Sequence, residues 1–149
     1  MADHLHKRHN VTLLLYHLVF PVKYRRKVFT PTSELSLKTV CTEVLAVSYE
    51  INFVEIGIDK DHAHFLIQLP PTMSVSEVVT KIKSITGKYL FLHHPDLRKI
   101  LWGGNFWTMG YYANTVGQYG NFAMIQNYMQ KQGLPEYKQL HQDMTSLFE

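Results

Sequence analysis

The chain has 149 residues, one cysteine, a formal net charge of +3 and 46% hydrophobic residues. A chain of this length and composition fits one domain, residues 1–149, and disorder of the whole chain is excluded. Its single Cys41 excludes an internal disulfide and a cysteine-based zinc site, while the mildly basic charge permits a nucleic-acid partner without requiring one.

The amino-terminal part predicts a loose segment followed by a buried strand. Residues 1–9 are polar, so we expect little fixed structure there. Residues 11–22 are rich in β-branched and aromatic side chains, which predicts a strand, and the run is too short to span a bilayer. Because no signal-peptide cleavage pattern follows, we expect a cytoplasmic protein without a membrane partner.

A basic turn follows this strand. Positive charges at this density suit contacts to DNA phosphates, which position a strand without reading its sequence, although a solvated charged surface is the alternative. The residues are Lys23, Arg25, Arg26 and Lys27.

The middle of the chain predicts a helix and two strands. Thr30 followed by Pro31 indicates a helix start, and apolar residues at helical spacing extend this helix to about residue 50. Residues 51–58 and 62–69 read as strands joined by a short acidic turn, and two prolines end the second strand.

The remaining elements complete a recognisable order. Ser74 and Glu77 form a capping-box pattern that begins a second helix. Residues 106–116 predict a fourth strand, whose aromatic side chains are expected mostly in the core, and residues 121–132 predict a third helix. This order is typical of an α+β, ferredoxin-like split βαβ antiparallel sheet with an extra carboxy-terminal helix. Right-handed crossovers place the first and third strands in its middle.

Two histidines in the third strand are candidate metal ligands. His62 and His64 are two positions apart, so both imidazoles lie on one face of the sheet, with Ala63 on the other. A neutral imidazole is a common metal ligand, and two neighbouring rings can chelate one cation. Taken alone, the pair fits two unconnected polar side chains on a solvated sheet face better than it fits a metal site.

The predicted third helix carries a candidate nucleophile. Tyr128 and Gln132 are four positions apart and share one helical face. A tyrosine phenol can attack phosphorus and form a covalent phosphotyrosine, and the amide oxygen of Gln132 can act as a third metal ligand. Ordinary packing of Tyr128 in an amphipathic helix is the alternative.

In combination these residues resemble the single-tyrosine HUH transposases of small bacterial insertion sequences, the IS-two-hundred-like or TnpA type. The stretch 61–67 is similar to the HUH motif, in which a bulky apolar residue separates two histidines; Ala63 is smaller than usual. Residues 16–27 look like the first strand and basic turn of this family, and residues 127–132 look like its nucleophile helix. The resemblance covers nearly the whole chain.

The resemblance implies a metal-dependent mechanism. Mg²⁺ or Mn²⁺ would be held by His62, His64 and Gln132, and Tyr128 would cut single-stranded DNA at hairpin-marked element ends, leaving a 5′-phosphotyrosine link. The bond energy would be kept in that link, so no nucleotide cofactor is expected. The family works as a homodimer in which the tyrosine helix of one subunit serves the histidine pair of the other.

Two other functions remain open at this stage. One is a host-adapted HUH nuclease that acts on repeated chromosomal hairpins without mobilising itself. The other is a non-catalytic binding module, because split βαβ folds with aromatic strands often bind single-stranded nucleic acid.

Overall fold

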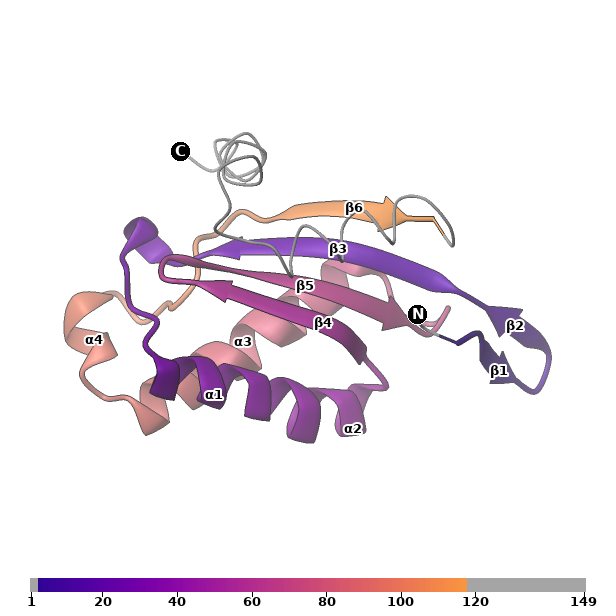
Figure 1. Cartoon of the computed structure of the whole chain (residues 1–149), viewed down its shortest axis with the longest axis horizontal. Helices are drawn as coiled ribbons and strands as arrows, with labels where there is room; N and C mark the ends of the chain where they lie inside the picture. Colours follow the sequence, from indigo (N-terminus) through magenta and orange to yellow (C-terminus); the bar gives the residue numbers. More distant parts are fainter. Residues whose placement is uncertain (1–2, 118–149) are drawn as a thin grey trace.

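Four antiparallel strands form the central sheet of the structure, a computed structural model that describes residues 3–117. Their order across the sheet is β4-β5-β3-β6, so the first and third predicted strands lie in the middle, as expected (Figure 1). The α+β, split βαβ prediction is therefore confirmed for this part of the chain. The strands are β3 (Leu14–Pro21), β4 (Asn52–Asp59), β5 (His62–Leu69) and β6 (Tyr112–Val116).

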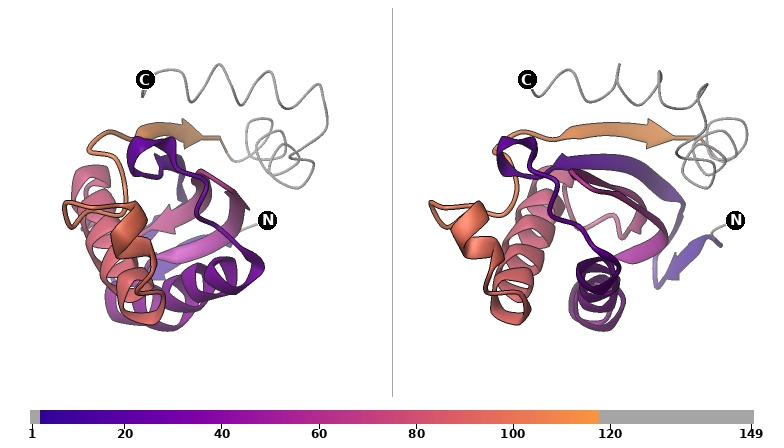
Figure 2. Two further views of the ribbon diagram at one scale, coloured as in Figure 1. Left: turned by 90° about the vertical axis from the view of Figure 1, so that its left-hand side faces the viewer. Right: turned by 60° about the vertical axis from the view of Figure 1, so that its left-hand side comes forward.

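Two long helical segments cover one face of this sheet (Figures 1 and 2). The first is α1 (Pro31–Val40), which continues through a π-helical turn, η2 (Cys41–Leu45), into α2 (Ala46–Tyr49). The second is α3 (Val75–His93), followed by the short α4 (Leu97–Ile100).

The sequence signals for the helix starts are confirmed. The Thr30 hydroxyl accepts a hydrogen bond from the Ser33 amide and the Ser74 hydroxyl accepts one from the Glu77 amide, so each satisfies a donor at the beginning of its helix. Cys41 is fully buried, and burial raises the pKa of its thiol, which therefore remains neutral and packs as a small apolar group.

The amino terminus differs from the expected loose segment. Residues 5–7 form β1 (Leu5–Lys7), which pairs with β2 (Asn10–Thr12) in a separate hairpin. Two contacts with distant parts of the chain hold this segment in place. The Lys7 ammonium lies 2.7 Å from a Glu50 carboxylate oxygen, and the Gln68 amide donates to the Asp3 carbonyl. Polar residues adopt fixed structure here because their backbone and charges find partners, which composition alone does not reveal.

The last strand is shorter than predicted. Only Tyr112–Val116 pairs with β3, and Trp107 makes an isolated bridge to Val22. Between them the Lys83 ammonium on α3 donates hydrogen bonds to the carbonyls of residues 108, 109 and 110 at 2.7, 3.1 and 2.8 Å. These carbonyls therefore bond to a side chain instead of extending the sheet. The predicted third helix, residues 121–132, lies outside the described residues.

A single hydroxyl on α3 anchors the segment that leads into β6. The Trp107 indole N–H donates to the Thr86 hydroxyl at 2.9 Å, and both side chains are buried. Thr86→Val keeps the shape but leaves the indole N–H without an acceptor, so we expect the free energy of unfolding to fall by about 1–3 kcal/mol. Urea unfolding, compared at an unchanged m value, measures this loss.

The same substitution at Thr80 is a matched control. Thr80 lies on the same helix, and its hydroxyl donates to the Ser76 carbonyl one turn earlier, at an exposed site. Thr80→Val should change stability by no more than about 0.5 kcal/mol. Equal losses in the two variants would show that the Trp107 contact contributes nothing beyond a general effect of valine in α3.

Candidate active site

Two buried histidines lie side by side at the start of β5. His62 and His64 are both 0% exposed, and their ring centroids are 4.8 Å apart. Because side chains alternate along a strand, the pair shares one face while Ala63 and Phe65 pack into the core. That core contains residues of α1 and α3, so the histidines lie on the opposite face of the sheet from these helices.

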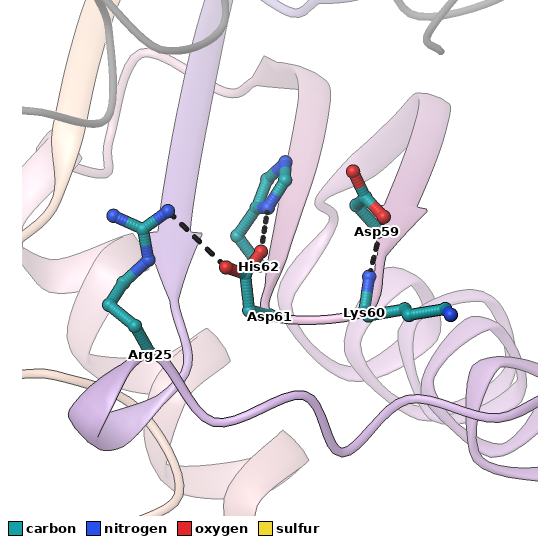
Figure 3. A network of polar contacts seen from close by, with 5 residues as sticks. All are labelled: Arg25, Asp59, Lys60, Asp61 and His62. Carbon is teal, nitrogen blue, oxygen red and sulfur yellow. Dashed lines mark hydrogen bonds and ion pairs between the residues drawn. The ribbon is translucent and has the colours of Figure 1, made fainter.

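His62 is oriented by the residue that precedes it. Its Nδ1 lies 2.7 Å from a carboxylate oxygen of Asp61, and the other oxygen of that carboxylate lies 3.3 Å from the Arg25 guanidinium (Figure 3). Partial burial works against ionisation of Asp61, but His62 and Arg25 outweigh it and lower the pKa of Asp61 to about 2. An ionised carboxylate therefore accepts from Nδ1, and Figure 3 shows the other ring nitrogen pointing away from it.

His64 is oriented by a third buried histidine. His17 on β3 places its Nε2 3.0 Å from Nδ1 of His64, and the two rings are stacked at an angle of 10°. Burial lowers the pKa of His17 to about 4, although its contact with Asn114 on β6 works in the opposite direction. His17 is therefore neutral near pH 7 and can accept a proton in a hydrogen bond from His64.

The two contacts orient both candidate ligands in the same way, with Nδ1 of each ring held by a hydrogen-bond partner. Since Nδ1 of each ring is hydrogen-bonded, a cation at this site would be coordinated through Nε2 of His62 and of His64. A metal-bound histidine usually has its second ring nitrogen hydrogen-bonded in this way. Within residues 3–117 no group of three or more His, Cys, Asp or Glu side chains could hold a metal ion. Any further protein ligand would therefore be of another residue type or lie outside residues 3–117.

The basic turn lies against the turn that directly precedes the histidines. It forms a short 3₁₀ segment, η1 (Lys23–Arg25), and the amide of Val28 just beyond it donates to the Lys60 carbonyl at 2.9 Å. Arg26 and Lys27 are exposed, as phosphate contacts require, whereas Arg25 is half-buried against Asp61. The structure thus divides the predicted basic cluster: Arg25 supports the site, Arg26 and Lys27 face solvent, and the partly exposed Lys23 donates to the Trp102 carbonyl.

Two predicted site residues, Tyr128 and Gln132, lie outside the described residues. Sequence reasoning, in turn, missed Asp61 and His17 as partners of the histidine pair. Asp61 belongs to the predicted turn between the two strands, and its signal is its position directly before His62. His17 had one signal, a lone polar residue inside an otherwise apolar strand.

Comparison with known proteins points in one direction. The family model described as "Transposase IS200 like" matches residues 10–132. The ISDra2 transposase TnpA of Deinococcus radiodurans is 30% identical over 80% of this chain and 84% of its own length. The transposase for insertion sequence element IS200 of Salmonella typhimurium is 32% identical over 89% of this chain and 85% of its own.

Solved structures agree on the fold. A Deinococcus radiodurans protein described as a candidate transposase superimposes with a TM-score of 0.70 at 28% identity, covering 86% of this chain and 97% of its own. A REP-associated tyrosine transposase bound to a REP hairpin gives a TM-score of 0.59 at 15% identity, covering 87% of this chain and 70% of its own.

Among residues 3–117, no helix is both long and apolar enough to cross a lipid bilayer.

Proposed function

The chain belongs to the IS200-like transposase family, and on that premise we propose that it cuts and rejoins single-stranded DNA at hairpin-marked element ends through a phosphotyrosine intermediate. One observation carries the proposal: two buried imidazoles share a sheet face, and each has its Nδ1 held by a buried or charged partner. A binding module has no evident need for such an arrangement, whereas a metal-dependent phosphoryl-transfer site does.

We propose Mg²⁺ or Mn²⁺ as the cofactor, held by His62, His64 and the amide oxygen of Gln132. When bound, such an ion stabilises the charge that develops on the scissile phosphate. The donor set is a mixed one: the amide oxygen is a donor that Mg²⁺ and Mn²⁺ prefer, and neutral imidazole nitrogens are common ligands of divalent metals. Asp61 and His17 would keep the two rings in the tautomer that coordinates through Nε2.

Tyr128 supplies the nucleophile. Its phenolic oxygen forms a bond to phosphorus, the bond from phosphorus to the 3′-oxygen breaks, and the 3′-oxygen receives a proton in place of the one lost by the phenol. The product is a 5′-phosphotyrosine and a free 3′-OH. A 3′-OH of another strand later attacks the same phosphorus and releases the phenol, so the number of phosphodiester bonds is conserved and no nucleotide cofactor is consumed.

A homodimer fits this chemistry. Excision requires cuts at two element ends, and each chain offers one proposed nucleophile, so a twofold dimer supplies both. We propose that Tyr128 of one subunit serves the histidine pair of the other. Hairpin DNA as the substrate is supported by the neighbour of the same fold that was solved with a REP hairpin.

An adduct assay tests the proposal. Protein, Mn²⁺ and a single-stranded hairpin oligonucleotide from an element end are incubated, then separated in denaturant. We expect DNA labelled at its 3′ end to stay bound to protein, because that fragment carries the phosphotyrosine. DNA labelled at its 5′ end should be released as a shorter fragment with a free 3′-OH. A non-catalytic module gives no adduct with either label, and a nuclease with a water nucleophile gives cleavage without one.

A further inference from the structure

Two aromatic side chains face solvent beside the basic turn. Tyr24 is 47% exposed and Trp102, which follows α4, is 64% exposed. Their ring centroids are 5.4 Å apart and the rings are tilted by 36°. Phe106 and Trp107, a few residues along the chain, are only 2% and 4% exposed. The core therefore takes up neighbouring aromatic rings and leaves these two outside it.

A lysine fixes the pair in place. The Lys23 ammonium lies 5.1 Å from the centroid of the Tyr24 ring and 5.9 Å from that of Trp102. It also donates to the Trp102 carbonyl at 3.1 Å. Gly103 allows this approach, because a β carbon at that position would lie 2.6 Å from the lysine nitrogen and the backbone there has φ +99°. The rings are therefore arranged before any ligand arrives.

The backbone that presents Tyr24 is strained. Tyr24 and Arg25 have φ of 60° and 54°, a left-handed conformation that residues with a β carbon rarely adopt, and here two adopt it in succession. This turn directs Tyr24 outward to Trp102 and Arg25 inward to Asp61. Strain of this kind concentrates at functional sites.

We propose that Tyr24 and Trp102 form a stacking site for an unpaired base of single-stranded DNA. Every nucleobase has an aromatic face, so such a site holds a strand without selecting its sequence. The exposed side chains of Arg26 and Lys27 follow directly and match the charge of the adjoining phosphates. Rings and cations together are the combination that single-stranded DNA requires, and neither component alone would specify it.

The aromatic pair is linked to the histidine pair through two contacts. Arg25, which follows Tyr24, contacts Asp61. Asp61 in turn contacts His62. A base held on the rings would therefore keep the adjoining strand close to the histidine pair. This inference rests on the proposed function, because single-stranded DNA is its ligand.

The test compares two oligonucleotides of equal length and charge. One is a short unstructured oligothymidylate and the other an abasic strand with the same phosphates but no bases. Binding is followed by fluorescence anisotropy at one fixed low salt concentration. We expect wild-type protein to prefer oligothymidylate, because only that strand can stack.

Three proteins are compared. In Trp102→Leu we expect oligothymidylate binding to weaken roughly 5- to 150-fold, which corresponds to the ~1–3 kcal/mol that stacking contributes per base. Binding of the abasic strand should not change. Trp102→Phe keeps a ring and should retain most of the preference. Because Trp102 is exposed, each variant should fold, which thermal unfolding verifies.

Intrinsic fluorescence gives an independent readout. The chain has two tryptophans, Trp102 and the buried Trp107. Oligothymidylate should quench the emission of the wild-type protein, and this quenching should disappear in Trp102→Phe, where the remaining indole lies in the core. Quenching that persists in the variant would contradict base stacking on Trp102.

The outcomes separate this inference from the proposed function. If Trp102→Leu binds both strands as wild type does, or loses affinity for both equally, the stacking site is wrong even where the hairpin adduct forms normally. If wild-type protein prefers oligothymidylate but never forms an adduct, the transposition chemistry is wrong and the stacking site stands.

Discussion

The variant Tyr128→Phe is expected to bind hairpin DNA like the wild-type protein and to form no covalent adduct. Removing the phenolic oxygen removes the atom that would bond to phosphorus, while the aromatic ring remains. Loss of an essential nucleophile lowers the rate by about 10³-fold or more. Adduct yield in denaturant, measured with DNA labelled at its 3′ end, reports the chemistry, and anisotropy of the same oligonucleotide reports binding.

Tyr111→Phe is the matched control for this prediction. Tyr111, directly before β6, is another tyrosine whose side chain reaches solvent, with 38% of its surface exposed. It has no glutamine one helical turn later, so the metal-ligand pairing proposed for Tyr128 has no counterpart there. The control variant should form the adduct at the wild-type rate. An adduct of undiminished yield in Tyr128→Phe would move the nucleophile to another residue.

Much of the fold could be predicted because local signals were strong. The strand at residues 62–69 has the predicted bounds, since two prolines end it. Helix α3 begins where Ser74 and Glu77 indicated. The position of β3 and β5 in the middle of the sheet followed from the handedness of crossovers, which is nearly invariant. Each of these features depends on neighbours in sequence or on a general rule of topology.

The parts that could not be predicted depend on contacts between distant segments. His17 and His64 are 47 positions apart and meet only because β3 and β5 pair in a particular register. Tyr24 and Trp102 meet because the fold brings the basic turn next to the segment that follows α4. Periodicity assigns a residue to a face of an element but says nothing about which residue of another element lies opposite.

The shortened β6 shows the same limit in the backbone. The composition of residues 106–116 favours a strand throughout, yet a lysine on another element binds the carbonyls in its first half. β-propensity is decided by context more than by intrinsic preference. The amino-terminal hairpin is the opposite case, in which polar residues form strands because Glu50 and Gln68 lie close enough to bind them.

The second large effect is expected for His64→Ala, which should lose cleavage with every divalent ion tested. Calorimetric titration with Mn²⁺ in the absence of DNA should show affinity lost by more than the 10–100-fold typical of an orienting partner, the effect expected for Asp61→Asn. Because His64 is fully buried, His64→Asn serves as a second variant that fills more of its space. His93→Ala, an exposed imidazole at the end of α3, is the control and should leave binding unchanged.

Mixing two inactive proteins decides how the subunits share the site. If Tyr128 acts on the histidine pair of the other subunit, a heterodimer of Tyr128→Phe and His64→Ala contains one intact site. That site combines the histidines of the first variant with the phenol of the second, so adduct formation should return to about a quarter of the wild-type level by random assortment of subunits. If both groups belong to one subunit, no combination is intact and mixing restores nothing. An unchanged Mn²⁺ affinity in His64→Ala would remove the metal from this account altogether, because the proposed site then lacks one of its two described ligands without any consequence.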